Sequence, residues 1–281
     1  MGRWEGVAYA AGTVLNALAT GVGSAFAIDL KTSVSLAEGG EGVKILVNGV
    51  ERRSNVAWRI LKQVNFQGVV DVRSEIPGGC GLGSSSAFVN ALLVAVKKYM
   101  QDELDAGEIL RTNARLSVEA GISYTGAFDD ASASLLGGFV VSENYKMRLY
   151  RRDEIEGYAA ILIPRFGRVE VDWGKIRAES KKLGAAIDAA KSGEYCRAMT
   201  ENTKYYCRIM GYPIRIADKG WMVGICCGLS GNGPAYVAFG SKSEMKAISN
   251  LWEDYGEVIV RKLVTSPVEN LVVPDYLFTD P

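Results

Sequence analysis

The sequence predicts a protein of the α+β class that is built in two parts. Stretches in which apolar and polar residues alternate, as in β-strands, lie between stretches with the three-to-four-residue apolar spacing of helices. The same mixture starts again after Arg151, and no unit of roughly 20–50 residues repeats along the chain. We therefore expect an N-terminal domain over residues 1–155 and a C-terminal domain over residues 156–281.

The N-terminal part is expected to contain four strands and four helices. The strands are recognised by their alternation and the helices by their apolar spacing, and the glycine-rich turn "EGGEG" joins the first two strands. The expected strands are Ser24–Leu36, Val43–Val50, Gly68–Ile76 and Gly138–Asn144, and the expected helices are Asn55–Asn65, Ser84–Met100, Ala106–Ala120 and a short one from Phe128 to the glycine pair at 137–138.

The C-terminal part is expected to contain four strands and three helices. Its first strand ends in a proline, and a second glycine-rich turn separates two strands within the segment "WMVGICCGLSGNGPAYVAFG". The other expected strands are Tyr158–Pro164 and Glu257–Val264, and the expected helices are Trp173–Lys191, Glu194–Met210 and Glu244–Tyr255.

Composition excludes several kinds of chemistry. The chain has no histidine, so Ser-His-Asp and Cys-His hydrolases are excluded, and acid–base chemistry must use another group, such as a carboxylate. Basic and acidic residues both number 32, which argues against a nucleic-acid partner. No apolar run is long enough to span a membrane, and the N-terminus does not resemble a secretory signal. We therefore expect a cytoplasmic protein without a membrane partner.

The five cysteines are expected to be buried free thiols, as is usual in a reducing compartment. No spacing among them forms a CxxC pair, and without histidine they do not complete a zinc site. They are Cys80, Cys196, Cys207, Cys226 and Cys227.

The segment "PGGCGLGSSSA" indicates a phosphate-binding loop. Four glycines precede three serines, and the serines fall at the expected N-cap and first turn of the helix from Ser84. Backbone N–H groups at a helix N-terminus have no internal partners, and glycines let an anion approach them closely. A structural turn with an ordinary serine cap is the alternative interpretation. The loop residues are Pro77, Gly78, Gly79, Cys80, Gly81, Leu82, Gly83, Ser84, Ser85, Ser86 and Ala87.

The residue pattern of this loop distinguishes between nucleotide-binding families. No lysine precedes the serines, as a Walker A loop requires, and the dinucleotide pattern GxGxxG does not fit in register. The segment does match P-x-x-x-G-L-G-S-S-[SA], and in this it resembles the GHMP kinases. Three further stretches resemble that family in the same order along the chain: Ala10–Leu30, "GAFDDASASLLGG" at Gly126–Gly138 and "GLSGNGPAYVAF" at Gly228–Phe239.

The resemblance implies an ATP-dependent small-molecule kinase. The implied fold has an N-terminal domain like ribosomal protein S5 and a C-terminal ferredoxin-like domain. The implied catalytic acid is Asp129, and the implied ligands of Mg²⁺ are Ser85 and Glu119. Phosphoryl transfer needs neutralised phosphate charge, a bridging metal and a positioned acceptor hydroxyl, and these residue types can supply all three. A solvated acidic pair at 129–130 and an exposed helix-end charge at Glu119 are the structural alternatives.

Details of the first stretch indicate the acceptor. Thr13 stands where mevalonate-kinase-like members carry a lysine, and the stretch instead resembles an archaeal branch of the family that phosphorylates the 3-hydroxyl of shikimate. Homoserine is the alternative acceptor, and a non-catalytic nucleotide-binding regulator is an alternative of another class. A carboxylate with ring hydroxyls needs one cation and several neutral partners. The candidate cations are Lys31, Arg73, Arg165 and Arg168, and the candidate neutral partners are Asn16, Thr20 and Ser24.

Overall fold

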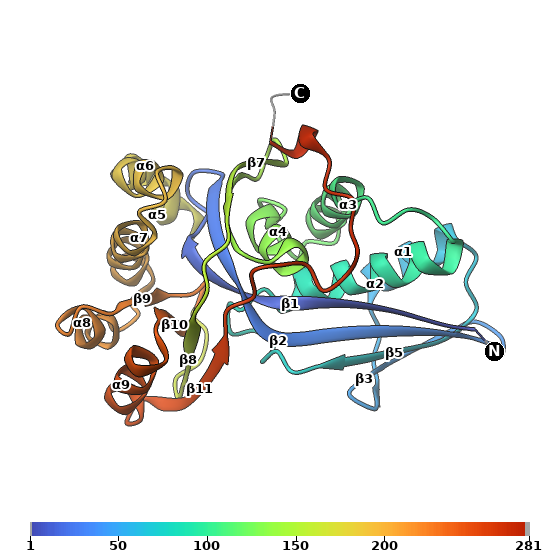
Figure 1. Ribbon diagram of the computed structural model, residues 1–281, viewed down its shortest axis with the longest axis horizontal. Helices are drawn as coiled ribbons and strands as arrows, with labels where there is room; N and C mark the ends of the chain where they lie inside the picture. The colour runs from blue at the N-terminus through green and yellow to red at the C-terminus, as the bar shows by residue number, and fades with distance from the viewer. Residues whose placement is uncertain (1, 279–281) are drawn as a thin grey trace.

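The computed structural model describes residues 2–278, and its first half is built on a seven-stranded sheet (Figure 1). The strand order is β4-β3-β5-β2-β6-β7, and β1 pairs with β2 outside this path. The strands are β1 (Arg3–Leu15), β2 (Val22–Glu38), β3 (Val43–Val47), β4 (Val50–Glu51), β5 (Gly68–Ser74), β6 (Phe139–Glu143) and β7 (Arg148–Asp153).

A long antiparallel hairpin of β1 and β2 runs the length of this sheet. The sequence pattern does not reveal β1, because its residues from Ala8 onward are buried on both faces and therefore do not alternate in polarity. Nor does it reveal β7, whose sequence "RLYRRD" is charged and which lies at the edge of the sheet. Of the two, β1 contains Thr13 and leads to Asn16 in the first of the predicted site stretches.

Four helices cover one face of the first sheet (Figure 1). They match the predicted helices to within two residues, and α2 matches at both ends. Side chains at two N-caps explain where the helices begin: Ser54 accepts a hydrogen bond from Ala57 N–H, and Asp105 accepts one from Glu108 N–H. The helices are α1 (Asn55–Gln63), α2 (Ser84–Met100), α3 (Ala106–Glu119) and α4 (Phe128–Leu136).

The second half is a four-stranded antiparallel sheet in the order β11-β8-β10-β9, with helices packed against it. The strands are β8 (Tyr158–Pro164), β9 (Cys226–Leu229), β10 (Tyr236–Gly240) and β11 (Gly256–Lys262), and the helices are α5 (Trp173–Ala178), α6 (Gly184–Lys191), α7 (Tyr195–Met210), α8 (Arg215–Trp221) and α9 (Lys242–Trp252). None of the helices within residues 2–278 is long and apolar enough to cross a bilayer.

The helical stretch predicted over Trp173–Lys191 is present but interrupted, because the chain leaves α-helical geometry at Glu179. A short 3₁₀ turn follows at Ser180–Leu183 before α6 begins. The Glu179 carboxylate accepts hydrogen bonds from Lys182 and Arg208, which hold this corner against α7. The helix α8 was not predicted.

An aromatic cluster joins the two sheets. The rings of Phe26 on β2 and Phe139 on β6 stack with centroids 4.9 Å apart, and Phe239 on β10 meets both of them edge-on. Each such pair contributes about 0.5–1.5 kcal/mol beyond its buried area. The backbone adds a direct link, since Val264 N–H donates to the Ala27 carbonyl. The two halves therefore pack on each other closely enough to share a site; the domain boundary near residue 155 stays a prediction.

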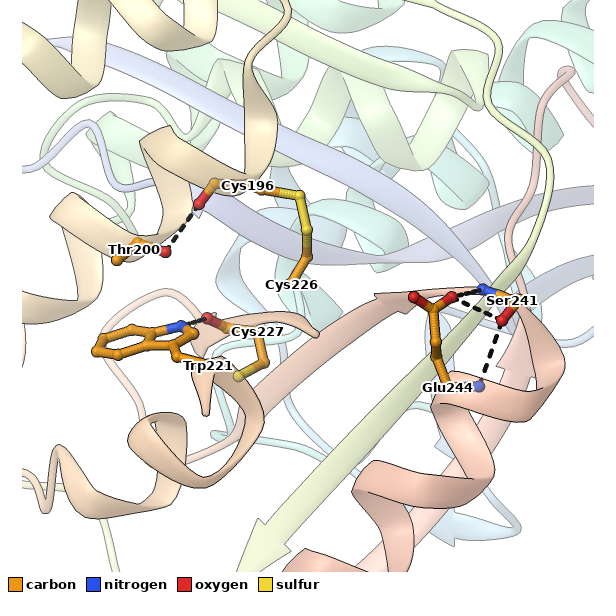
Figure 2. Close-up of a disulfide and its surroundings, with 7 residues drawn as sticks. All are labelled: Cys196, Thr200, Trp221, Cys226, Cys227, Ser241 and Glu244. Atoms are coloured by element: carbon orange, nitrogen blue, oxygen red, sulfur yellow. Dashed lines mark hydrogen bonds between the residues drawn. A yellow bond between two sulfur atoms is a disulfide. The ribbon is translucent and has the colours of Figure 1, made fainter. Parts of the chain in front are cut away.

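The expectation of five free thiols is wrong for two cysteines. Cys196 on α7 and Cys226 on β9 form a disulfide, with Cα atoms 5.1 Å apart (Figure 2). This separation lies within the usual range for a disulfide. The pairing carries no spacing signal, because the two cysteines are 30 residues apart and meet only through the packing of α7 on β9. Cys80, Cys207 and Cys227 are free.

Candidate active site

A cavity of about 570 Å³ opens where the two halves meet. Its wall comes from the phosphate loop and α2, the end of β1, the start of α4, the second glycine-rich turn and the segment around Arg168. The lining residues used below are Thr13, Asn16, Gly79, Gly81, Leu82, Gly83, Ser84, Ser85, Ser86, Thr125, Asp129, Asp130, Arg168, Glu170 and Asn232. We call this space the active-site cavity.

The phosphate loop ends at an uncapped helix N-terminus. Gly83 is the N-cap of α2, and its φ of 65° lies in the left-handed region that favours glycine. No side chain caps this helix, so the serine cap expected from the sequence is wrong, and the three serines instead form the first turn. Because the first-turn N–H groups have no side-chain partner, they are available to an anion in the cavity.

The phosphate loop is fixed by the second glycine-rich turn and by β1. The Ser230 hydroxyl donates to the Gly81 carbonyl at 2.7 Å, and Ala235 N–H donates to the Cys80 carbonyl at 3.2 Å. On the other side, Ala11 N–H donates to the Leu82 carbonyl at 3.0 Å. The loop is therefore held in one conformation by segments far away in the sequence.

Two adjacent carboxylates from the first turn of α4 line the cavity. Asp129 is 5% exposed, and its Oδ1 accepts a hydrogen bond of 2.8 Å from Asn144. Asp130 faces the phosphate loop, since the Cβ of Asp130 would lie 3.6 Å from a Cβ placed on Gly83. Within the described residues, the buried Oδ1 of Asp130 has no hydrogen-bond partner.

The surroundings of the pair decide which acid carries a proton. Burial raises the pKa of Asp129, and hydrogen bonds from Asn144 and from the backbone N–H groups of Asp130 and Asp129 oppose that rise. Burial and the neighbouring charge of Asp129 raise the pKa of Asp130 well above its ordinary value, and no donor opposes them. The pair therefore ionises first at Asp129, and Asp130 keeps its proton to higher pH.

The two residues expected to bind metal are separated in the structure. Ser85 lines the cavity, whereas Glu119 lies at the exposed end of α3 and forms an ion pair of 3.2 Å with Arg59. Among residues 2–278, no cluster of three acidic or cysteine side chains is arranged to hold a metal. Magnesium usually takes one or two protein carboxylates and fills its shell with phosphate and water oxygens. The serine hydroxyls and acidic side chains of the cavity supply oxygen donors of that kind, so the residues present fit Mg²⁺.

Only part of the predicted acceptor set reaches the cavity. Asn16 lines it, but its side-chain amide donates to Gly231 O and Asn232 Oδ1 and thereby holds the second glycine-rich turn. Thr20 bonds locally to Val22, and the buried Ser24 hydroxyl has no partner among the described residues; neither lines the cavity.

Of the four predicted cations, only Arg168 lines the cavity, and it is the only basic residue in the described part of the chain that does so. The other three are engaged elsewhere. Lys31 pairs with Asp29, Arg73 pairs with Asp71, and Arg165 donates to the Asp254 carbonyl. Among the loop residues, Pro77, Gly78, Cys80 and Ala87 support the loop without lining the cavity. The structure also adds Asn144, which no motif in the sequence had indicated.

The fold and this site define a class of small-molecule kinase. The family described as "GHMP kinases N terminal domain" matches residues 48–138, which include the phosphate loop and both acids of α4. Together with the relatives described next, this match shows that the chain belongs to the GHMP kinase family.

Within that family, the chain is similar over nearly its whole length to proteins named shikimate kinase. The protein of that name from Archaeoglobus fulgidus is 62% identical over 271 residues, which cover 96% of each chain. The one from Methanothrix thermoacetophila is 38% identical and covers 93% of this chain and 94% of its own.

Solved structures support the fold independently of close sequence similarity. The Methanococcus jannaschii mevalonate kinase superimposes with a TM-score of 0.72 at 15% identity and covers 94% of this chain and 98% of its own. The Cytophaga hutchinsonii homoserine kinase gives a TM-score of 0.67 at 17% identity over 93% of this chain and 96% of its own. The predicted fold class is thus confirmed.

Proposed function

We propose that this enzyme is a shikimate kinase that transfers the γ-phosphoryl group of ATP to the 3-hydroxyl of shikimate. The observation that carries the proposal is the 62% identity to a protein of that name over 96% of both chains. The cavity adds independent support, because it combines an uncapped phosphate loop, a buried carboxyl group held by Asn144 and one cation.

In this proposal the two ends of the cavity bind the two substrates. The loop N–H groups and Ser85 hold the phosphates of ATP, and Asp129 accepts the proton of the acceptor hydroxyl. The hydroxyl oxygen bonds to the γ-phosphorus while the bond from that phosphorus to the β-bridging oxygen breaks, so the products are the phosphate monoester, ADP and a proton. When bound, Mg²⁺ would neutralise phosphate charge, and Ser85 would be one of its ligands. Glu119 would have to break its ion pair with Arg59 before it could also bind the metal.

The acceptor carboxylate is assigned to Arg168. A guanidinium is suited to bidentate pairing with a planar carboxylate, and no other basic residue in the described chain lines the cavity. The nearby Glu170 also lines it and can accept hydrogen bonds from ring hydroxyls.

Glu170 also gives one reason to keep homoserine as a second candidate, because a carboxylate beside an arginine could hold a zwitterionic amino acid. The test is a comparison of purified enzyme with ATP and shikimate, homoserine or mevalonate, following ADP release and identifying the product by mass. We expect rapid turnover of shikimate alone. Turnover of homoserine without shikimate would reject the proposal in favour of the second candidate, and turnover of neither would reject both.

A further inference from the structure

Asn144 lies at the point where three parts of the active site meet. It directly follows β6, is 2% exposed, and faces both Asp129 at the start of α4 and Thr125 in the segment before it. Its Nδ2 donates to Asp129 Oδ1 at 2.8 Å and to Thr125 Oγ1 at 3.3 Å. Its Oδ1 accepts from Asp129 N–H at 3.2 Å and from the Ser142 hydroxyl at 2.7 Å. The four hydrogen-bonding positions of its amide are thus all occupied.

The chemistry of these partners fixes which way the amide points. The backbone N–H of Asp129 can only donate, so it must face the oxygen of Asn144. The carboxylate of Asp129 can only accept when ionised, so it must face the nitrogen. Asn144 therefore contacts the main chain and the side chain of the same residue, and both contacts together define the direction of the Asp129 carboxylate.

The backbone of Asn144 is also fixed by hydrogen bonds on both sides of the residue. Its backbone N–H donates to the Gly21 carbonyl at 2.8 Å, and its carbonyl accepts from Met147 N–H at 3.1 Å. These bonds fix the residue in the turn between β6 and β7 and tie it to the start of β2. Helix α4 needs this support, because its N-cap, Ala127, has no side chain that could bond the first-turn N–H groups.

We propose that Asn144 is a positioning residue for phosphoryl transfer: it caps the first turn of α4 from outside the helix and aims the Asp129 carboxylate at the acceptor hydroxyl. This inference rests on the proposed role of Asp129 as the base. Asn144 itself does not line the cavity. Its effect should appear in the chemical step and leave nucleotide binding unchanged, because the phosphate loop is held by other segments.

The test compares Asn144→Asp, Asn144→Ser and the wild-type enzyme. Asp is nearly isosteric and keeps the acceptor for Asp129 N–H, but it removes the donor and places a second carboxylate against Asp129. Ser is smaller and adds no charge, and its single hydroxyl cannot replace both the two N–H donors and the carbonyl acceptor of the amide. We expect kcat to fall by roughly 10²-fold in both variants, the usual cost of a misplaced catalytic group. ADP affinity by calorimetry and the KM for ATP should stay unchanged.

A variant with a purely structural defect serves as the control. Ile248→Ala opens a cavity under α9, far from the site, and should lower the melting temperature while leaving kcat unchanged. If the Asn144 variants behaved like this control, or lost ATP affinity together with kcat, the inference would be overturned. A wild-type enzyme inactive on shikimate would reject the proposed function instead, and the variants would then be compared on whichever acceptor is turned over.

Discussion

Gly81 in the phosphate loop lies directly against Ser230 in the second glycine-rich turn. The Ser230 hydroxyl donates to the Gly81 carbonyl, and a Cβ placed on Gly81 would lie 2.2 Å from the Ser230 carbonyl oxygen. Thr13 N–H donates to the same hydroxyl at 3.1 Å, so β1 is part of the contact. Nothing larger than glycine fits at this position, which accounts for Gly81 among the glycines of the loop.

Replacing Gly81 with alanine should therefore destabilise the protein. The added Cβ meets backbone that cannot move aside, and the φ of 82° is unfavourable for an L-residue. We expect the free energy of unfolding to fall by more than about 1 kcal/mol, measured by urea denaturation. Gly78→Ala is the matched control, because nothing lies within 4 Å of its added Cβ and its φ is not in the left-handed region. Equal stability of the two variants would contradict the close packing.

Asp129→Asn should remove the base while keeping the shape of the side chain. We expect kcat to fall by roughly 10²–10⁴-fold with little change in ATP affinity. Asp130→Asn should be much milder, because that acid carries the proton of the pair and has no donor that holds it ionised. Steady-state kinetics and nucleotide binding of both variants test which of the two acids is the base. If Asp130→Asn were inactive while Asp129→Asn stayed active, the two assignments would have to be exchanged.

The stability of Asp130→Asn relative to wild type should depend on pH. The folded protein binds the Asp130 proton more tightly than the unfolded chain, because burial raises its pKa above the ordinary 3.8. The free energy of unfolding of the wild type therefore decreases as pH rises above 3.8. The decrease is about 1.4 kcal/mol for each pH unit, until the pH reaches the pKa of Asp130 in the folded protein. The variant lacks this loss, so its advantage should grow as the pH is raised above 3.8. Urea denaturation at several pH values measures it, and a constant difference would contradict the burial of this acid.

Arg168→Gln should weaken acceptor binding selectively. A hydrogen bond to a charged group contributes about 1.5–3 kcal/mol, so we expect the KM for shikimate to rise by roughly 10–100-fold while the KM for ATP stays unchanged. Arg165→Gln is the matched control, because its guanidinium donates to the Asp254 carbonyl outside the cavity. A rise in the KM for ATP would instead place Arg168 at the phosphates.

The disulfide between Cys196 and Cys226 should stabilise the fold without affecting catalysis. It closes a loop over a sequence separation of 30, for which loss of chain entropy in the unfolded state predicts about 3–4 kcal/mol. Replacing both cysteines with serine should lower the melting temperature and leave kcat unchanged, since neither residue lines the cavity. A reductant should lower the melting temperature of the wild type alone. Titration of all five thiols in the unreduced, denatured protein would show that the bond is absent.

The sequence predicted those elements whose pattern is local. Helix α2 and strand β8 were found with their observed bounds, because apolar spacing and flanking glycine or proline mark them. Strand β1 was missed because burial on both faces removes alternation, and the interruption at Glu179 was missed because contacts from Lys182 and Arg208 create it.

In the candidate site, too, residues in a local motif could be predicted and residues that depend on distant contacts could not. The phosphate loop and the acidic pair could be found because each lies in a contiguous motif with a recognisable residue pattern. Asn144 could not, since a single asparagine after a strand has no distinctive pattern and its role depends on a helix that begins 16 residues earlier, at Phe128. Arg168 could be proposed as one of four cations, but only packing at the cavity distinguishes it from the other three.

The contact between Gly81 and Ser230 spans 149 residues, and this separation affects how the enzyme is made. A ribosome synthesises the phosphate loop well before Ser230 and the turn that holds the loop. Until that turn has left the exit tunnel, only β1 can hold the glycine-rich segment, through the hydrogen bond from Ala11 N–H to the Leu82 carbonyl. Cellular ATP is therefore expected to stabilise the folded loop only after synthesis has passed Ser230.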